Sequence, residues 1–219
     1  MFAVQVASTV AETVPAPEVL RRLREGNARY VSNVRSLDSL LSYTRRAELS
    51  AGQSPIAIIL GCSDSRVPAE VVFDQGLGDL FVIRVAGNIV APSQVGSVEF
   101  AASLYGSRLV VVLGHTHCGA IQATVDELEG HPPPDSENLR FIVDSVRPAI
   151  EPLMATDLAK DHDALKRAGG RANVCKTANH LRHGSPLLES LIAKGGLIVV
   201  GAEYDLSSGH VEFFDGVPE

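Results

Sequence analysis

The stretch RLVVVLGHTHCGA, residues 108–120, passes from an apolar run directly into a turn that holds two histidines and a cysteine. An uninterrupted run of branched apolar residues is typical of a strand that is buried on both faces, as in a parallel sheet. Gly114 ends this run, and a helical pattern starts at about Gly119. The sequence therefore predicts a buried strand, a short polar turn and a helix, in this order.

Three further apolar runs have the same character: PIAIILG (55–61), DLFVIRVAG (79–87) and GLIVVGAEY (196–204). Helix-like segments precede or separate these runs, at residues 15–33, 38–50, 93–106 and 185–196, the last with Ser185 as N-cap and Pro186 as first helical residue. Strands that alternate with helices predict an α/β fold with a central, mainly parallel sheet flanked by helices. HVEFFDG (210–216) adds a hairpin partner or edge strand, and HPPPDSEN (131–138) is predicted to be a loop.

The composition is that of a soluble globular protein of 219 residues, 45% hydrophobic and 21% charged. A formal net charge of -7 argues against a nucleic-acid-binding protein, which usually carries a basic face. No apolar stretch reaches the ~18 residues of a membrane span, and the N-terminus lacks the basic start and apolar core of a secretory signal. We therefore expect a cytoplasmic protein without nucleic-acid or membrane partners. Since neither a repeat nor a linker divides the chain, we expect one domain over residues 15–219 after a tail of residues 1–14.

Three cysteines, Cys62, Cys118 and Cys175, make an odd and low count that does not suit a disulfide framework. Cys175 lies in a helix-like segment, where a small residue on a helix face is the plain interpretation. Cys62 and Cys118 lie instead in the short motifs CSDSR and HTHC, each at the end of a predicted strand. Because the carboxyl ends of parallel strands gather functional groups at one edge of a sheet, we expect the two motifs to form one site.

The spacing within these motifs favours a metal site. His115 and Cys118 are three residues apart in a strand-to-helix turn, so their side chains can converge on one point. The side chains of His117 and Cys118, which are neighbours, diverge. With Cys62, His115 and Cys118 make three zinc-type ligands, and three protein ligands with one open position are the pattern of a catalytic zinc site.

Asp64 is the ambiguous group beside these ligands. Two residues after Cys62, it can point to the same side of the strand end. There it can complete the set of metal ligands or stand beside the metal as a hydrogen-bond acceptor. Arg66 favours the second arrangement, because a guanidinium can hold the carboxylate in a two-pronged ion pair. An ordinary surface turn with an ion pair is the alternative for both residues.

With these motifs in place, the sequence resembles the β-class carbonic anhydrases over nearly the whole chain after residue 15. The resemblance is carried by LRRLREGNARYV, SPIAIILGCSDSRVPAE, FVIRVAGN, VGSVEFAA, LVVVLGHTHCGA and SPLLESLIAKGGLIVVGAEYDLSSG. It implies one Zn2+ per chain on Cys62, His115 and Cys118, with Asp64 and Arg66 as the conserved dyad of the family. It implies four parallel strands plus an antiparallel edge strand, and a homodimer, or a tetramer, in which N-terminal helices clasp the neighbouring subunit. The implied activity is reversible hydration of carbon dioxide to bicarbonate and a proton by zinc-bound hydroxide.

The resemblance also assigns substrate-binding positions. Gln53 matches a glutamine that in plant-type members donates a hydrogen bond to the bound substrate across the dimer interface. Phe81, Ala86 and Phe100 match apolar pocket positions, although Phe100 stands where plant-type enzymes carry tyrosine, and plain core packing is the alternative for all three. Gly119 matches a glycine whose backbone N–H can approach bicarbonate.

One departure from the family concerns regulation. Some members have a noncatalytic bicarbonate site built from a tryptophan, an arginine and a tyrosine, and Arg84 and Tyr204 match the last two. The tryptophan position is Ile59, and the chain contains no tryptophan. We therefore expect no bicarbonate allostery of that kind and a form in which Asp64 stays off the zinc at neutral pH, although Gly61 also occurs in the allosteric members.

Other interpretations stay open at this point. His117 is a candidate proton shuttle, since histidine titrates near neutrality, or else a solvated turn residue. The metal motif would also suit a hydrolase of carbonyl sulfide or carbon disulfide on the same scaffold, or a nonenzymatic zinc protein with Asp64 as fourth ligand.

Two thiolates should leave the zinc a weaker acid than three imidazoles would, so we expect activity to titrate somewhat above pH 7. The remaining histidines show no ligand spacing: His131, His162, His180, His183 and His210.

Overall fold

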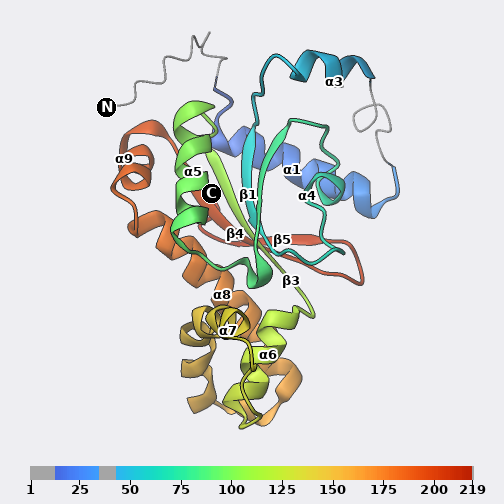
Figure 1. Ribbon diagram of the computed structural model, residues 1–219. Helices are drawn as coiled ribbons and strands as arrows, with labels where there is room; N and C mark the ends of the chain where they lie inside the picture. Colours follow the sequence, from blue (N-terminus) through green and yellow to red (C-terminus); the bar gives the residue numbers. More distant parts are fainter. Residues whose placement is uncertain (1–12, 35–42, 219) are drawn as a thin grey trace.

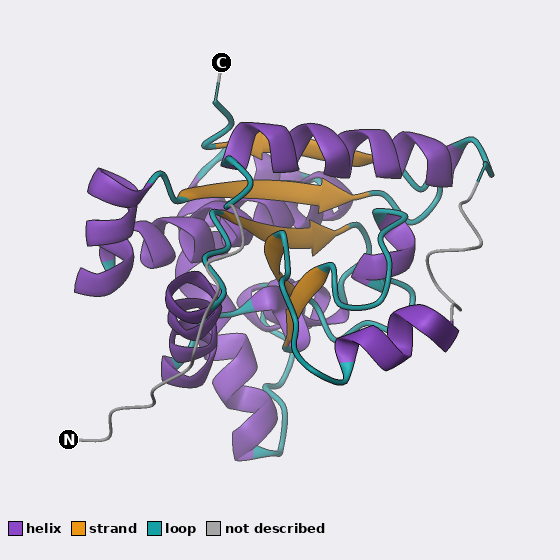
Figure 2. Ribbon diagram, turned by 90° about the horizontal axis from the view of Figure 1, so that it is seen from above, coloured by secondary structure: helices purple, strands orange, loops and turns teal. Residues whose placement is uncertain are grey.

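The computed structural model describes residues 13–34 and 43–218, and its helices lie on both faces of a five-stranded sheet (Figures 1 and 2). The strands are β1 (Ala57–Gly61), β2 (Leu80–Arg84), β3 (Leu109–His115), β4 (Ile198–Tyr204) and β5 (Val211–Asp215). The α-helices are α1 (Ala16–Val31), α3 (Tyr43–Leu49), α4 (Ala69–Val72), α5 (Pro92–Leu104), α6 (Gly119–Leu128), α7 (Glu137–Ile150), α8 (His162–His183) and α9 (Pro186–Gly195). Short 3-10 turns are η1 (Ala86–Asn88), η2 (Glu151–Ala155) and η3 (Asp157–Lys160).

The strands lie in the order β2-β1-β3-β4-β5. The first four are parallel to one another, and β5 runs antiparallel to β4 at the edge. This arrangement confirms the predicted sheet, and each predicted apolar run contains its strand except that β3 extends one residue further, to His115. The strand order reverses between β1 and β3, which makes their carboxyl ends a topological switch point, the usual place for a ligand in an α/β fold.

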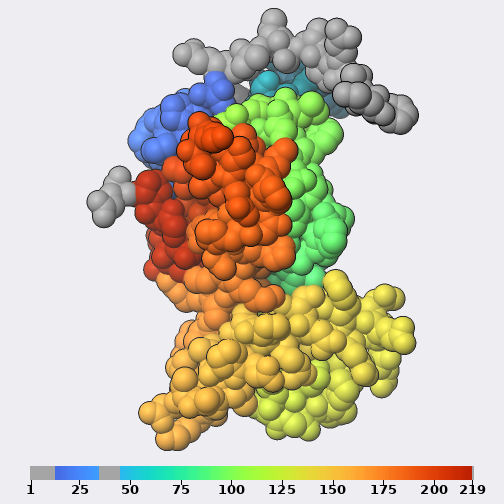
Figure 3. Space-filling model, turned by 90° about the vertical axis from the view of Figure 1, so that its left-hand side faces the viewer, coloured from blue at the N-terminus to red at the C-terminus, as the bar shows by residue number. Residues whose placement is uncertain are grey.

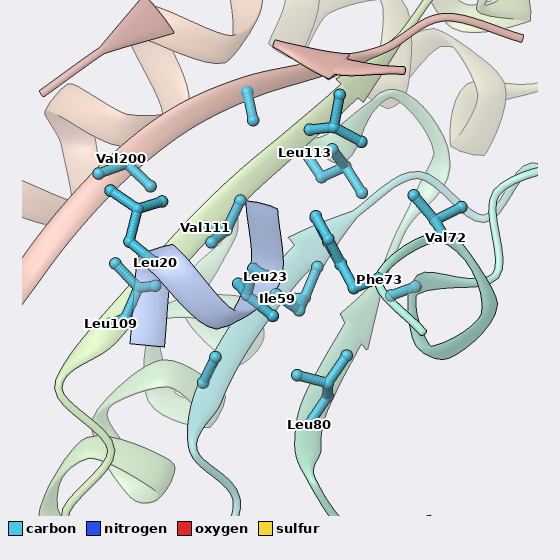
Figure 4. Packing of buried hydrophobic residues seen from close by; sticks show 14 of the residues in the cluster. Leu20, Leu23, Ile59, Val72, Phe73, Leu80, Leu109, Val111, Leu113 and Val200 are labelled. Atoms are coloured by element: carbon cyan, nitrogen blue, oxygen red, sulfur yellow. The ribbon is translucent and has the colours of Figure 1, made fainter. Parts of the chain in front are cut away.

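Side chains of β1 and β3 alternate between two cores, because successive residues of a strand point to opposite faces. On one face, Ile59 and Val111 pack with Leu23 of α1 (Figure 4). On the other face, Ile58 and Val110 pack with residues of α5, α8 and α9. Every residue of β1 and β3 is buried, and this explains why both strands read as continuous apolar runs rather than as alternating patterns.

A third apolar cluster builds a lobe from α6, α7 and the first half of α8, which projects below the sheet in Figures 1 and 3. Val125, Val146, Ile150 and Leu165 form its centre. Cys62 and Cys118 belong to the same cluster. The predicted metal ligands therefore lie at the seam between the sheet and this lobe.

The helix predictions hold with small changes at the ends. In α9, Ser185 caps the N-terminus by accepting a hydrogen bond from Leu188 N–H at 3.2 Å, and Gly196 ends the helix at φ 69°. The predicted loop over 131–138 ends earlier, because α7 begins at Glu137. The helix predicted over 38–50 appears as α3, while residues 38–42 and most of the predicted tail, residues 1–12, lie outside the described residues. Within the described ranges, no helix is long and apolar enough to cross a membrane.

Candidate metal centre

The two predicted motifs form one buried site. Cys62 follows β1 directly, His115 is the last residue of β3, and Cys118 is the N-cap of α6. The three side chains belong to residues that are at most 5% exposed, and their ligand atoms all lie within 4.8 Å of one another. The Cys62 and Cys118 sulfurs are 4.0 Å apart, far from a disulfide and near the roughly 3.8 Å that two Zn–S bonds of about 2.3 Å span in a tetrahedron.

His115 presents one ring nitrogen to this site. Its Nδ1 lies 2.9 Å from the Thr116 carbonyl oxygen, which can only accept, so Nδ1 carries the proton. Its Nε2 is buried and has no hydrogen-bond partner among the described residues. A buried lone pair without a donor is unfavourable, and a cation between Nε2 and the two sulfurs would satisfy it. The residues present therefore fit a zinc ion.

The two thiols interact strongly when no cation is bound. The pKa of Cys62 is lowered, first because the Cys118 S–H donates a hydrogen bond to its sulfur. The pKa of Cys118 is raised, by that same hydrogen bond and by burial, although two N–H groups in the first turn of α6, those of Ile121 and Ala120, act in the opposite direction. One thiolate thus forms readily, and a cation would supply the charge that lets the second form.

Asp64 lies beside the triad and is held by Arg66. The guanidinium donates from Nε to Oδ1 at 2.9 Å and from Nη2 to Oδ2 at 2.7 Å, and the Arg66 backbone N–H donates to Oδ1 at 2.9 Å. These hydrogen bonds keep the pKa of the Asp64 carboxyl well below its usual range. Its Oδ2 is 3.8 Å from His115 Nε2. An ionised carboxylate therefore faces the triad from the side, in the two-pronged pair that the sequence predicted.

Arg84, at the end of β2, holds the turn that carries Cys62 and Asp64. Its Nε donates to the Cys62 carbonyl oxygen at 3.0 Å, and its Nη2 donates to the Asp64 carbonyl oxygen. Tyr204 is buried, with its hydroxyl 3.0 Å from that of Tyr30 in α1, and Ile59 is a core residue. The expected absence of a tryptophan-based bicarbonate site at these positions stays a prediction.

The predicted substrate residues fall into two groups. Gly119 is the first residue of α6 and lines a cavity of about 340 Å³ together with His115, His117 and Cys118. Ala86 is the first residue of η1, the short turn that follows β2. The structure thus places Gly119 directly at the triad.

Gln53, Phe81 and Phe100 form a separate group around Tyr105. Gln53 Nε2 donates to the Tyr105 hydroxyl at 2.9 Å, and the ring centroids of Phe81 and Phe100 lie 6.0 Å and 5.8 Å from that of Tyr105. Phe100 is 51% exposed on α5. None of these residues lines the cavity beside His115 and Cys118 within its own chain.

His117 stands on the flank, as the spacing predicted. It is exposed, has φ 54°, and its carbonyl oxygen accepts a hydrogen bond from Arg66 Nη2 at 3.3 Å. Its side chain lines the cavity but is not part of the triad.

Sequence analysis missed a second cluster, of Asp126, Glu129 and His162, whose ligand atoms also lie within 4.8 Å of one another. His162 Nδ1 is 2.8 Å from Glu129 Oε2, across a gap of 33 residues that no local spacing reveals. All three residues are partly exposed and already hydrogen-bonded, so the cluster is explained as a surface link between α6 and α8.

The donor set and its position define a class of site. One imidazole and two cysteine sulfurs at the switch point of an α/β sheet, with a carboxylate held to one side, match the donor set of a zinc site of the catalytic type.

Comparison with known proteins agrees and is more specific. The family model described as carbonic anhydrase matches residues 57–211. Carbonic anhydrase 2 of Mycobacterium tuberculosis (strain CDC 1551 / Oshkosh) is 37% identical over 199 residues, 90% of this chain and 92% of that protein. Carbonic anhydrase of Mycolicibacterium smegmatis is 38% identical over 193 residues, 88% and 90% of the two chains. The solved β-carbonic anhydrase CafA of Aspergillus fumigatus, 24% identical, shares the fold with a TM-score of 0.72 over 92% of this chain and 91% of that one.

The chain therefore belongs to the β-class carbonic anhydrase family, and its enzymatic activity is that of a carbonic anhydrase.

Proposed function

We propose that this enzyme holds one Zn2+ per chain on Cys62, His115 and Cys118, and hydrates carbon dioxide reversibly to bicarbonate and a proton. In this proposal Asp64 orients the attacking oxygen and Arg66 holds Asp64 in place. The observation that carries the proposal is the position of the Asp64 carboxylate, ionised and 3.8 Å from the free nitrogen of His115.

When bound, Zn2+ supplies Lewis acidity that makes water a nucleophile near neutral pH. The Asp64 carboxylate is acceptor-only when ionised, so it accepts a hydrogen bond from the attacking oxygen and turns the lone pair of that oxygen towards carbon dioxide. Arg66 occupies both carboxylate oxygens and so keeps Asp64 from becoming a fourth ligand. This role of Arg66 argues against the nonenzymatic alternative, in which Asp64 would be a permanent ligand.

The start of α6 supports binding of the product. Gly119 is its first residue, and the N–H groups of the first turn of a helix favour negative charge nearby. A Cβ at Gly119 would meet no atom within 4 Å, so packing does not demand glycine there. We propose that the Gly119 N–H steadies the developing bicarbonate oxygens, with Ala86 on the apolar side of the pocket.

A second subunit completes the site in this proposal. Gln53, Phe81 and Phe100 lie around Tyr105 rather than at the triad of their own chain, and Phe100 and Leu104 leave an apolar face of α5 exposed. We propose a homodimer, or a tetramer built from it, in which these residues face the partner's metal site and the N-terminal helices clasp the neighbouring subunit. We further propose that residues 15–219 form one domain that works in the cytoplasm.

Zinc dependence tests the proposal. Protein stripped with a chelator should lose carbon dioxide hydration, and one equivalent of Zn2+ per chain should restore it. Zinc bound at one equivalent without hydration at any pH would overturn the proposed mechanism and leave carbonyl sulfide and carbon disulfide as the next substrates to assay.

A further inference from the structure

The turn that follows β2 lies against one of the metal ligands in an unusual backbone conformation. Gly87 and Asn88 both have positive φ, at 69° and 42°. Glycine adopts this region freely, and asparagine enters it more readily than other residues with a Cβ, so the sequence permits this turn. The Gly87 N–H donates a hydrogen bond to Cys62 Sγ at 3.4 Å. This turn therefore presents a donor to a sulfur of the triad.

Two side chains of α8 hold this turn from one side. Asn173 Nδ2 donates to the Gly87 carbonyl oxygen at 2.8 Å, and Thr177 Oγ1 donates to the Asn88 carbonyl oxygen at 3.1 Å. The two residues are one helical turn apart on the same face of α8 and are 1% and 2% exposed. Successive carbonyls of the turn are thus each held by a buried donor.

The lobe confines the same turn from another side. A Cβ added at Gly87 would lie 2.9 Å from the Ala120 Cβ and 3.4 Å from a methyl group of Val146, so α6 and α7 leave no room there. The α8 donors and the lobe thus hold the turn from two sides.

The orientation of Asn173 follows from its partner. The Gly87 carbonyl oxygen only accepts, so the amide must present its NH2 group to it. In this orientation Asn173 Oδ1 is buried and makes no hydrogen bond within the residues that the structure describes. An unpaired buried oxygen is unfavourable, so a purely apolar residue would suit the packing better. The Asn173 amide therefore contributes through the hydrogen bond that it donates to the Gly87 carbonyl oxygen.

We infer that Asn173 and Thr177 are positioning residues for the metal centre: they clamp the Gly87–Asn88 turn, aim the Gly87 N–H at the Cys62 sulfur, and so set how strongly this thiolate donates to the bound cation. The inference rests on the proposed zinc site. A hydrogen bond to a metal thiolate draws charge away from the metal, and such outer partners commonly tune the site. Losing the clamp should make Cys62 a stronger donor in a less well-ordered site.

Cobalt substitution tests this directly, because Co2+ bound by thiolates has a sulfur-to-metal charge-transfer absorption that reports the donor strength of sulfur. The variants are Asn173→Leu and Thr177→Val, which remove the two donors, and Thr177→Ser, which keeps the hydroxyl. Asn27→Leu is the matched control, since Asn27 is a comparably buried amide that donates to Val72 and Gly209 carbonyls away from the triad. Zinc affinity is measured in parallel by competition with a chelator.

The inference predicts that the charge-transfer band moves to lower energy in Asn173→Leu and Thr177→Val, with zinc affinity about 10-fold weaker. Thr177→Ser should keep the wild-type band, and Asn27→Leu should lose thermal stability with the band unchanged. An unchanged band in a folded Thr177→Val would overturn the inference, even if Asn173→Leu fails to fold. A wild-type protein without any thiolate-to-cobalt band would instead contradict the proposed metal site itself.

Discussion

Asp64 Oδ2 lies 3.8 Å from His115 Nε2, while Arg66 binds both oxygens of the same carboxylate. The first distance places the carboxylate within reach of a group carried by a metal on the triad. In the proposed mechanism, the two-pronged pair fixes it there in the ionised state and away from the metal. The mechanism proposed for this chain depends on that separation, because a carboxylate that bound the metal would close the open position.

Removing the Arg66 guanidinium should release Asp64 to bind the metal. We expect Arg66→Ala to lower kcat/KM for carbon dioxide hydration by about 100-fold, since it removes a group that orients the proton acceptor. Arg66→Lys keeps the positive charge but cannot donate two parallel hydrogen bonds to the carboxylate, so it should retain an intermediate activity. Steady-state hydration assays on proteins with equal zinc content check this, and full activity of Arg66→Ala would contradict it.

Zinc binding should depend on the triad and not on Cys175, the cysteine outside it. Cys118→Ser should lose most bound zinc, measured by metal analysis after dialysis, because a serine hydroxyl is a far poorer zinc ligand than a thiolate. Cys175→Ser is the control: Cys175 lies on α8, half-buried and outside the triad, and its serine variant should keep one zinc per chain. Equal zinc loss in both variants would mean that the triad is not the site.

The Asp64–Arg66 pair also predicts a pH dependence of stability. Because Arg66 lowers the pKa of Asp64 in the folded protein, the ionised carboxylate stabilises the fold above the unfolded pKa of about 3.9, and this contribution is lost as pH falls through the lower folded value. The free energy of unfolding of Asp64→Asn should therefore lie below that of wild type at about pH 5, and the difference should shrink progressively as pH falls below about 4. Urea unfolding of the metal-free proteins measures this difference. A difference of the same size at pH 5 and at pH 2 would contradict the lowered pKa of Asp64.

The cap of α9 should matter for stability alone. Ser185 Oγ accepts from Leu188 N–H and donates to Glu99 Oε1 at 2.6 Å, so it both starts α9 and ties it to α5. Ser185→Ala should cost about 1–2 kcal/mol in unfolding free energy with activity unchanged. Ser190→Ala, an exposed position of the same helix, should cost a small fraction of that, and equal losses in both variants would argue against the cap.

Local patterns in the sequence predict much of this structure, because several features depend on residues close in the chain. The runs around Ile59 and Val111 are buried on both faces, so they predict parallel strands directly. The three-residue spacing of His115 and Cys118 marks a convergent pair, and CSDSR brings Asp64 and Arg66 together within one turn.

Contacts between distant segments could not be predicted in the same way. Nothing near Asn173 in the sequence shows that its amide reaches Gly87, and the cluster of His162 with Glu129 arises only when α6 and α8 meet. Gln53 matched a substrate residue by resemblance, but its hydrogen bond to Tyr105 depends on how the segment before β1 packs on the end of α5.

The most direct test of the central claim is stopped-flow carbon dioxide hydration, between about pH 6.5 and 9, by zinc-loaded wild type and Asp64→Ala with equal zinc content. Wild type should hydrate carbon dioxide rapidly, at a rate that rises with pH, and Asp64→Ala should lose about 100-fold or more of that rate. Wild-type rates and an unchanged pH profile in Asp64→Ala would contradict the role assigned to the carboxylate beside His115.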